Sequence, residues 1–331
     1  MANKRSGRHA IIAALLRDFP QASNHTLAKR LHSEHPAQFP KLEPALQCVR
    51  YFRGGKGKRD RRYATIAPSE RDSANRLPTA IPEEWTPFEL DCRRCLILSD
   101  IHVLFQANRA ITAALQYGDS FDPDAILING DFFDFYQLSK FIKKPTLVSV
   151  GNELLAGGKL LDLISARFPK AKKVFKKGNH DERWDKYLYD VAALLSDIPG
   201  ITEGWRVPGG IVRNNFEVVG DKRPIMLGKL PVLHGHELPI KSSVNPARAA
   251  WLKTNHTCLF GHFHQSTSYS PTDMFHDENA TWSTGCLCQL SPQYMPINSW
   301  TWGFAAVEVH RDQSFDVHNM RIEKNGKVRA S

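Results

Sequence analysis

The sequence lacks any apolar run long enough to cross a membrane. A transmembrane helix requires about 20 predominantly apolar residues, whereas the apolar runs here, such as 95–98 and 125–128, have the length of strands. The apolar stretch 10–16 near the N-terminus is short, is followed by Arg17 and Asp18, and has no small-residue cleavage site. We therefore expect a helix there rather than a secretion signal, and no membrane partner.

Cysteine is scarce as well. The 331 residues contain six cysteines, scattered at positions 48, 92, 95, 258, 286 and 288. This spacing is not that of a disulfide framework, so we expect free, buried thiols in a protein of the reducing cytoplasm. The alternative is a zinc site formed by Cys92, Cys95, Cys286 and Cys288. We assign these cysteines no function.

Acidic residues are rare in only one part of the chain. Residues 1–66 contain 14 Lys and Arg but 4 Asp and Glu, whereas the remaining residues contain 30 of each kind. The formal net charge of +10 therefore lies entirely in the first fifth of the sequence. Such an asymmetry favours a polyanion, such as nucleic acid, as partner of this segment, and improved solubility is the alternative.

Three short helices are predicted in this basic segment. Apolar residues recur at helical spacing from Ile11 to Phe19, where Pro20 ends the pattern. A second helix, capped by Asn24, ends before Pro36, and a third extends from about Leu42 to Gly54. Three short helices in about 50 residues are typical of a helix-turn-helix bundle. We predict a small all-α, helix-turn-helix-like domain over residues 1–66.

Basic residues and glycines follow the third predicted helix. With glycines at positions 54, 55 and 57, this run is flexible enough to track a phosphate backbone. A solvated linker is the alternative interpretation. The predicted nucleic-acid-binding residues are Arg50, Arg53, Lys56, Lys58, Arg59, Arg61 and Arg62.

The rest of the chain divides into a linker and a catalytic domain. Residues 67–92 contain four prolines without sustained periodicity, which predicts an interdomain linker. Over residues 93–331, short apolar runs first alternate with helical patterns, which indicates an α/β core. Beyond residue 256 the strand patterns follow one another with few helices between them, so we expect a second, more antiparallel sheet.

Side chains able to bind metal follow five of the predicted strands. They are Asp100, His102, Asp131, Asn179, His180, His234, His262 and His264. In open α/β sheets, the loops at the carboxyl ends of the strands line a common crevice, so these residues can meet despite their separation in sequence. Carboxylates and an amide mixed with imidazoles suit Mn²⁺, Fe or Zn²⁺ better than Mg²⁺, which prefers oxygen ligands only.

The motifs DIH, GDFFD, GNHD, HGH and GHFH, in this order, resemble the five signatures of the calcineurin-like metallophosphoesterase superfamily over about residues 95–310. The resemblance implies an α/β fold, a two-sheet sandwich flanked by helices, with two divalent metal ions. It assigns Asp100, His102 and His264 to the first metal and Asn179, His234 and His262 to the second. Asp131 would bridge the two. We expect Mn²⁺, with Fe or Zn²⁺ as alternatives.

The resemblance also implies roles for residues that do not bind metal. His180 would face the substrate as general acid or transition-state stabiliser, and Asp134 or Asp181 would orient it. The alternative for Asp181 is a solvated or helix-capping carboxylate. Arg183 would either contact the substrate phosphate or form a salt bridge on a helix face.

Details of the motifs reduce the number of possible substrate classes. Serine/threonine phosphatases of the superfamily have an arginine after the second signature, where this chain has Phe135 and Tyr136. GDFFD looks more like the signature of repair-type nucleases and broad-acting phosphodiesterases. A short helix-turn-helix-like head on this catalytic core resembles phosphoesterases of bacteriophages and prophages. We predict a metal-dependent phosphoesterase, a nuclease-like enzyme that hydrolyses phosphodiester bonds in DNA or RNA.

Other functions remain as alternatives to the nuclease. A phosphomonoesterase or small-nucleotide phosphodiesterase is the first, a phosphoprotein phosphatase the second, and a non-catalytic DNA-binding regulator the third. The aromatic cluster of Tyr294, Trp300 and Trp302 is typical of side chains that cover a sheet edge or core, and stacking on a base at the rim of the site is its alternative role. The sequence patterns do not fix the oligomeric state.

Overall fold

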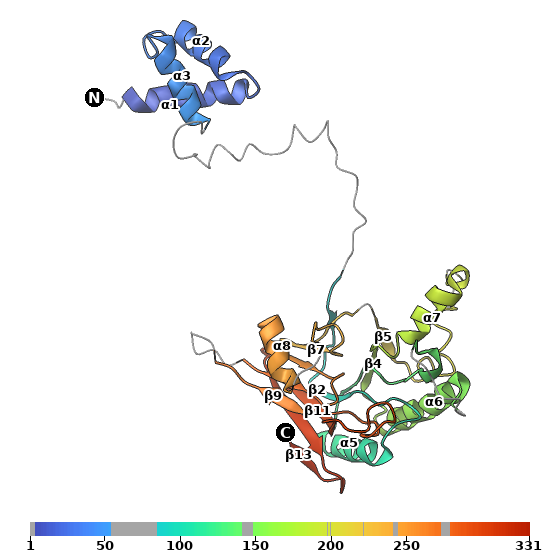
Figure 1. The fold of residues 1–331 in the computed structure, drawn as a ribbon. Coiled ribbons are helices and arrows are strands. Elements are labelled where there is room, and N and C mark those ends of the chain that lie inside the picture. The colour runs from blue at the N-terminus through green and yellow to red at the C-terminus, as the bar shows by residue number, and fades with distance from the viewer. Residues whose placement is uncertain are drawn as a thin grey trace. The chain divides into compact units, whose positions relative to one another are not determined.

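The structure, a computed structural model, describes residues 4–53, 85–140 and 148–331, apart from positions 197, 199, 221, 241–243 and 273–278. The chain divides into two compact units, Met1–Pro82 and Glu83–Ser331, which are coloured along the chain in Figure 1. The predicted nucleic-acid-binding residues Lys56, Lys58, Arg59, Arg61 and Arg62 lie outside the described residues.

The first unit contains the three predicted helices. They are α1 (Lys4–Asp18), α2 (Asn24–Glu34) and α3 (Leu42–Phe52). Their apolar faces meet in a core that includes Ile12, Leu31 and Val49. The cap of α2 is Ser23 rather than Asn24, because the Ser23 hydroxyl accepts a hydrogen bond from the backbone N–H of Thr26 at 3.1 Å. Both residue types cap helices well, so the sequence alone does not fix this position. The helix-turn-helix resemblance stays a prediction.

The second unit is built on two β-sheets. The seven-stranded sheet has the order β13-β12-β11-β2-β3-β4-β5. Its strands are β2 (Arg94–Leu98), β3 (Ala125–Asn129), β4 (Lys172–Lys176), β5 (Glu217–Val219), β11 (Trp302–Val309), β12 (Phe315–Ile322) and β13 (Val328–Ala330). Strands β2 to β5 are parallel, and β11, β12 and β13 continue the sheet antiparallel.

The six-stranded sheet has the order β1-β6-β7-β8-β10-β9. Its strands are β1 (Phe88–Glu89), β6 (Ile225–Leu227), β7 (Leu230–Leu233), β8 (Cys258–Phe260), β9 (Thr267–Tyr269) and β10 (Thr281–Ser283). The pairs β1–β6, β7–β8 and β8–β10 are parallel, whereas β6–β7 and β9–β10 are antiparallel.

We predicted that the strands beyond residue 256 form a second, more antiparallel sheet, and this is wrong, because these strands are divided between the two sheets. Strands β8, β9 and β10 join the mixed sheet, whereas β11 pairs with β2, with Ala305 opposite Ile97, and so extends the parallel sheet. The reason is that periodicity identifies a strand but not its neighbours. The stretch 303–307 of β11 is buried throughout, as befits a strand between two others.

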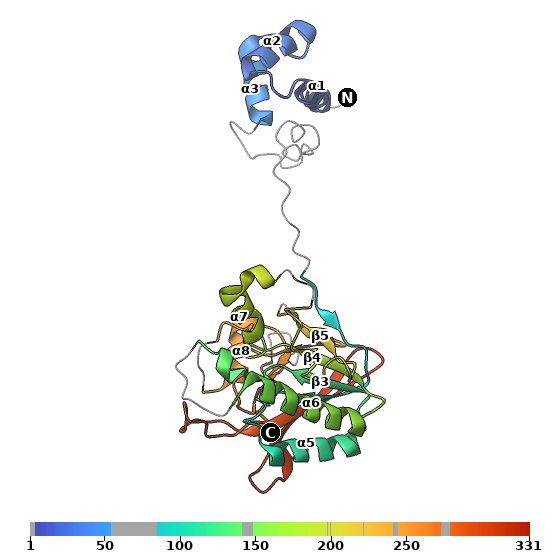
Figure 2. The same cartoon turned by 90° about the vertical axis from the view of Figure 1, so that its right-hand side faces the viewer.

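The sheets stack face to face between helices. Along β2, Leu96 and Leu98 pack into the core beneath the helices α5 (Asn108–Phe121) and α6 (Val150–Arg167), while Ile97 faces the six-stranded sheet. Figure 2 shows α5 and α6 on one face of β3 and β4. On the six-stranded sheet, the helix α8 (Pro246–Thr254) packs through Ala250 with Phe260. The predicted two-sheet α/β sandwich flanked by helices is confirmed.

Three short helices complete the second unit. The first residues of this unit also show that the predicted linker ends too late. The 3₁₀ helix η1 (Tyr136–Leu138) follows the loop after β3, the helix α7 (Arg183–Val191) follows the loop after β4, and the 3₁₀ helix η2 (Ala193–Leu195) comes directly after α7. Phe88 and Glu89, expected in the linker 67–92, form β1 and pair with β6, and Leu90 is buried. A two-residue strand shows no periodicity in the sequence, so the predicted end of the linker lies too far along the chain. Residues 67–84 lie outside the described part of the chain.

Among the helices of the described ranges, none has the length and the apolar character that crossing a membrane requires.

Candidate metal centre

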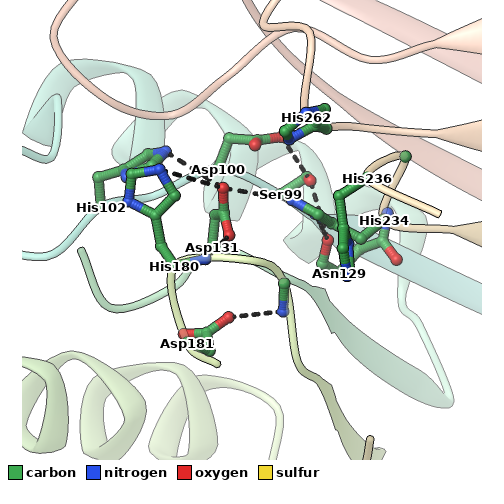
Figure 3. A network of polar contacts seen from close by, with 12 residues as sticks. Ser99, Asp100, His102, Asn129, Asp131, His180, Asp181, His234, His236 and His262 are labelled. Carbon is green, nitrogen blue, oxygen red and sulfur yellow. Dashed lines mark hydrogen bonds and ion pairs between the residues drawn. The ribbon is translucent and has the colours of Figure 1, made fainter. Parts of the chain in front are cut away.

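The predicted ligands follow the carboxyl ends of five strands. In the seven-stranded sheet, Asp100 follows β2, Asp131 follows β3 and Asn179 follows β4. In the six-stranded sheet, His234 follows β7 and His262 follows β8. Each set comes from neighbouring parallel strands, so each set of loops lies at one edge of its sheet. In Figure 3, Asp100 and Asp131 lie between His102 and the imidazoles of His234 and His262.

The backbone is unusual at most of these positions. Five predicted ligands have left-handed φ angles: Asp100 (56°), His102 (48°), Asp131 (51°), His262 (69°) and His264 (57°). Residues other than glycine seldom adopt this conformation, and such strain collects at functional sites, where surrounding contacts maintain it.

Glycines next to the ligands allow the loops to approach each other. Gly130 has a φ of +85°, and a Cβ there would overlap the His234 imidazole. A Cβ on Gly178 would overlap the carboxylate and the backbone nitrogen of Asp131. The glycines of the GD and GN motifs are thus required by the close contact of three loops.

The side chains assigned to the first metal lie together. The Nε2 atoms of His102 and His264 are 3.3 Å apart, and Nε2 of His264 is 3.2 Å from Oδ1 of Asp100. This Oδ1 atom is buried and accepts no hydrogen bond. The other oxygen, Oδ2, accepts hydrogen bonds from the Ser99 hydroxyl at 2.6 Å and from the backbone N–H of His262 at 2.9 Å. One carboxylate oxygen is thereby fixed, and the other is free to bind a cation.

The second group has the same character. The Nδ1–H of His234 donates to the carbonyl oxygen of Asn129 at 2.8 Å, which leaves a lone pair on Nε2, the form that binds metal. Nε2 of His234, Oδ1 of Asn179 and Nδ1 of His262 are all buried and have no hydrogen-bond partner. Buried polar atoms rarely lack partners. A cation would satisfy all three.

Asp131 lies between the two groups. Its Oδ2 is 3.3 Å from Nε2 of His234 and 3.8 Å from Nε2 of His102. Its Oδ1 accepts a hydrogen bond from the backbone N–H of His180 at 2.8 Å. Possible metal-binding sets include His102 with Asp131 and His180, and Asp131 with His234 and His262. Because Asp131 belongs to both sets, it has the place that a bridging carboxylate requires.

Opposite charges dominate the electrostatics of this centre. Burial alone would raise the pKa of Asp131, but the neighbouring imidazoles, above all those of His234 and His180, lower it well below its usual range. Conversely, burial would lower the pKa of His234, but the Asp131 carboxylate raises it to about 10. The residues thus favour a positive charge between them, and a cation would supply it in place of protons.

Asp134, Arg183 and His180 form a connected group beside the ligands. The Oδ1 atom of Asp134 accepts hydrogen bonds from Nδ1 of His180 at 2.5 Å and from Nδ1 of His102 at 3.1 Å. Arg183 donates to the carbonyl oxygen of Asp134 at 2.7 Å and to Nε2 of His180 at 3.1 Å. Asp134 therefore orients one predicted ligand and the predicted catalytic histidine at once.

Asp181 has a different role. Its two carboxylate oxygens accept hydrogen bonds from the backbone N–H groups of Phe133 and Gly178, both at 2.9 Å. Burial, followed by the charge of Asp131, raises the pKa of Asp181 to about 7. The carboxylate joins the second and third motif loops, as Figure 3 shows in part, instead of orienting His180 or capping α7.

Ser99, Asn129 and the ion pair of Lys176 with Glu237 also support the site and were not among the predicted residues. Nζ of Lys176 lies 2.8 Å from Oε1 of Glu237, and the lysine side chain is fully buried. Oε2 of Glu237 accepts a hydrogen bond from the backbone N–H of Gly235 at 2.6 Å, so this pair holds the HGH loop. Burial opposes ionisation, yet the charge of Lys176 lowers the pKa of Glu237 to about 2. The signal for the pair was a lysine at the end of a buried strand.

The cysteines are free thiols, as expected. Sγ of Cys288 lies 3.9 Å from Nδ1 of His264, whereas Cys92 and Cys95 belong to the core between the sheets. The thiol of Cys288 thus contacts the ring nitrogen of His264 that faces away from Asp100.

Two of the predicted nucleic-acid-binding residues lie in the described part of the first unit. The Arg53 guanidinium donates to Oδ1 of Asn24 at 2.9 Å and to the carbonyl oxygen of Pro20 at 3.1 Å. These hydrogen bonds hold the loop between α1 and α2, a structural role the prediction did not include. Arg50 is half-buried on α3.

Comparison with known proteins places the second unit in a family. Residues 93–308 match the family model described as calcineurin-like phosphoesterase. The chain therefore belongs to the calcineurin-like phosphoesterase family, a class of metal-dependent phosphoesterases, and the resemblance inferred from the five motifs is confirmed. No curated protein sequence matches the chain.

Solved structures to which the chain is similar include three proteins. Vacuolar protein sorting 29 from Cryptosporidium parvum is 10% identical, with a TM-score of 0.39, over 72% of this chain and 96% of that one. A metallophosphoesterase from Sphaerobacter thermophilus is 16% identical (TM-score 0.36; 70% and 89% covered), and the phosphoesterase Yfce from E. coli is 14% identical (TM-score 0.33; 67% and 96% covered).

Proposed function

We propose that this protein hydrolyses phosphodiester bonds in nucleic acid with the help of two divalent cations. The observation that carries this proposal is the position of Asp131, whose Oδ2 faces His102 of one ligand group and His234 of the other. Seven side chains would hold the ions: Asp100, His102 and His264 for the first, Asn179, His234 and His262 for the second, and Asp131 for both.

The donor atoms fit such a pair of ions. The buried atoms without hydrogen-bond partners, Oδ1 of Asp100, Oδ1 of Asn179 and Nε2 of His234, are all atoms that bind divalent metals. Mn²⁺ is the ion we propose, and Fe or Zn²⁺ suits the same ligands. When bound, two such ions would lower the pKa of a water molecule to near neutrality and offset charge on phosphoryl oxygens.

The neighbouring residues supply the remaining chemistry. Nε2 of His180 lies 3.9 Å from Oδ2 of Asp131, so this nitrogen faces the reacting region, while Nδ1 is fixed by Asp134. We propose that His180 stabilises the transition state, or that its Nε2, after taking up a proton in place of the hydrogen bond from Arg183, passes that proton to the leaving oxygen, with Asp134 as the positioning residue of His180. Arg183 would contact a phosphoryl oxygen, since its guanidinium is held beside His180.

Two features support nucleic acid as the substrate. The second motif continues with Phe135, whose ring is buried, so this position has no arginine to bind a phosphorylated protein residue. The first 66 residues carry the whole positive charge excess, which would concentrate a polyanion near the catalytic domain. The helix-turn-helix-like and phage-type character of the head belongs to this proposal. A phosphomonoesterase or small-nucleotide phosphodiesterase is the second candidate, because family membership supports it equally.

A substrate panel tests the proposal. The Mn²⁺-loaded protein is assayed with single-stranded DNA, duplex DNA, RNA, a cyclic nucleotide, a phosphopeptide and simple phosphate esters. We expect a polynucleotide to be hydrolysed fastest at physiological salt, with loss of activity after chelation. Faster hydrolysis of a monoester or the phosphopeptide would contradict the nucleic-acid substrate, and no hydrolysis of any ester would contradict the enzyme.

A further inference from the structure

The loop of residues 290–300 lies against one predicted metal ligand. The rings of Trp300 and His264 have centroids 4.1 Å apart and meet edge to face, at an interplanar angle of 67°. The next residue, Thr301, donates its backbone N–H to the carbonyl oxygen of His264 at 2.8 Å. The end of this loop is thereby fixed next to the GHFH motif.

A network of hydrogen bonds gives the loop a defined shape. The side-chain amide of Asn298 donates to the carbonyl oxygens of Leu290 at 2.7 Å and Met295 at 2.8 Å. Its Oδ1 atom accepts a hydrogen bond from the backbone N–H of Trp300 at 2.9 Å. One side chain therefore joins the start, the middle and the end of the loop, which preorganises its surface for binding.

The loop exposes large apolar side chains beside the candidate centre. Tyr294 is 70% exposed and Ile297 is 93% exposed, and the Tyr294 ring lies 6.2 Å from that of Trp300. Trp302, by contrast, donates its indole N–H to the carbonyl oxygen of Cys288 and packs against the core. Trp302 thus has the structural role expected of such clusters, whereas Tyr294 exposes its ring and Trp300, half-buried, joins that ring to His264. Exposed apolar groups at a catalytic site mark a binding surface.

We propose that Tyr294 and Trp300 form a subsite that stacks an unpaired nucleobase of the substrate next to the metal centre. This inference rests on the proposed function, since it names the group attached to the scissile phosphate. An aromatic ring can stack on any of the nucleobases, so such a subsite binds the strand whatever its sequence. A base inside a duplex is already stacked on both sides, so the subsite favours a single strand or a strand end.

The test uses the full-length protein loaded with Mn²⁺ and two single strands of equal length and charge. One strand is oligothymidine, and the other carries abasic tetrahydrofuran residues. We expect Tyr294→Ala to lower kcat/KM about tenfold or more on oligothymidine and to leave cleavage of the abasic strand unchanged. Tyr294→Phe keeps the ring and should retain activity. Leu252→Ala removes an exposed apolar side chain on α8, outside this loop, and serves as the control that should leave both rates unchanged.

A binding measurement separates the failure of this inference from failure of the proposed function. Calorimetry compares thymidine 5′-monophosphate with deoxyribose 5-phosphate, and the base should tighten binding in the wild type but not in Tyr294→Ala. Base-dependent binding without cleavage of either strand would overturn the nuclease and support the subsite. Equal cleavage of both strands by wild type and Tyr294→Ala would overturn the subsite and leave the nuclease intact.

Discussion

Asp134 connects a predicted metal ligand with the predicted catalytic residue. Its Oδ1 atom accepts hydrogen bonds from both His102 and His180, and each donates through Nδ1. The Nε2 atom of His102 is then free for a cation, and the Nε2 atom of His180 is directed toward the reacting region. A single carboxylate therefore sets the tautomer of two imidazoles.

We expect His180→Ala to lower turnover at least a hundredfold while the fold and the metal content stay intact, because general acid catalysis contributes about this factor. Turnover is measured on the best substrate of the panel after reconstitution with Mn²⁺. The control is His310→Ala, which removes an exposed imidazole paired with Asp316. Near-normal turnover in fully metallated His180→Ala would exclude this role.

The ion pair of Lys176 and Glu237 yields a prediction on stability and pH. Glu237→Gln leaves the fully buried Lys176 without its counter-ion, which should lower the free energy of unfolding by about 3–5 kcal/mol near neutral pH. The folded-state pKa of Glu237 is lowered to about 2, so its contribution is present above the unfolded value near 4.5 and is lost as the pH falls toward 2.

Urea unfolding at pH 7 and in acid measures this effect. The difference between wild type and Glu237→Gln should shrink as the pH falls, whereas the exposed Glu308→Gln should change stability little at either pH. A difference that stays constant or grows in acid would show that the Glu237 charge does not act through Lys176.

At the scale of elements, the turns after β3 and β4 bring the ligand loops into contact. We expect Gly178→Ala to reduce Mn²⁺ binding and lower the melting temperature, because its Cβ would overlap Asp131. The matched control is Gly151→Ala in α6, where the nearest atom to a new Cβ is 4.0 Å away and alanine favours the helix. Unchanged metal stoichiometry in Gly178→Ala would refute this account of the turn.

The strands that carry ligands could be predicted because each is a short apolar run ending in polar residues. The order in which these strands pair within the sheets could not be predicted. The run around Ala305 is as apolar as any other strand, and only pairing with β2 places it in the parallel sheet. The two-residue strand β1 and the cap at Ser23 depend on contacts that leave too little trace in the sequence. Local pattern thus fixes elements, whereas tertiary contacts decide their neighbours and ends.

At the scale of the whole molecule, the charge asymmetry between the parts of the chain predicts a truncation effect. Removing residues 1–82 should slow polynucleotide cleavage at physiological salt and spare the hydrolysis of small esters, which do not need the basic segment. The cut must precede β1, because Phe88 and Glu89 belong to the catalytic sheet. Ester hydrolysis reports that the shortened protein is folded, and equal loss on both substrate classes would contradict the prediction.

The placement of the predicted ligands at strand ends could be inferred from the sequence, because the motifs there use few residue types in a recognisable order. The contacts that hold those side chains in place could not be predicted. Ser99 bonds Asp100, and Trp300 contacts His264, through side chains that are ordinary in sequence and acquire their role only when distant segments meet. The sequence therefore indicates which side chains follow the strands, and the structure adds which contacts position them.

The most direct test of the two-metal centre is the number of Mn²⁺ ions bound per chain. Chelator-treated protein is titrated with Mn²⁺ while free ions are followed by electron paramagnetic resonance. We predict two bound ions for the wild type and at most one for Asp131→Ala, since this carboxylate faces both ligand groups. Binding of no ion by the wild type, or of two by Asp131→Ala with unchanged affinity, would contradict the account.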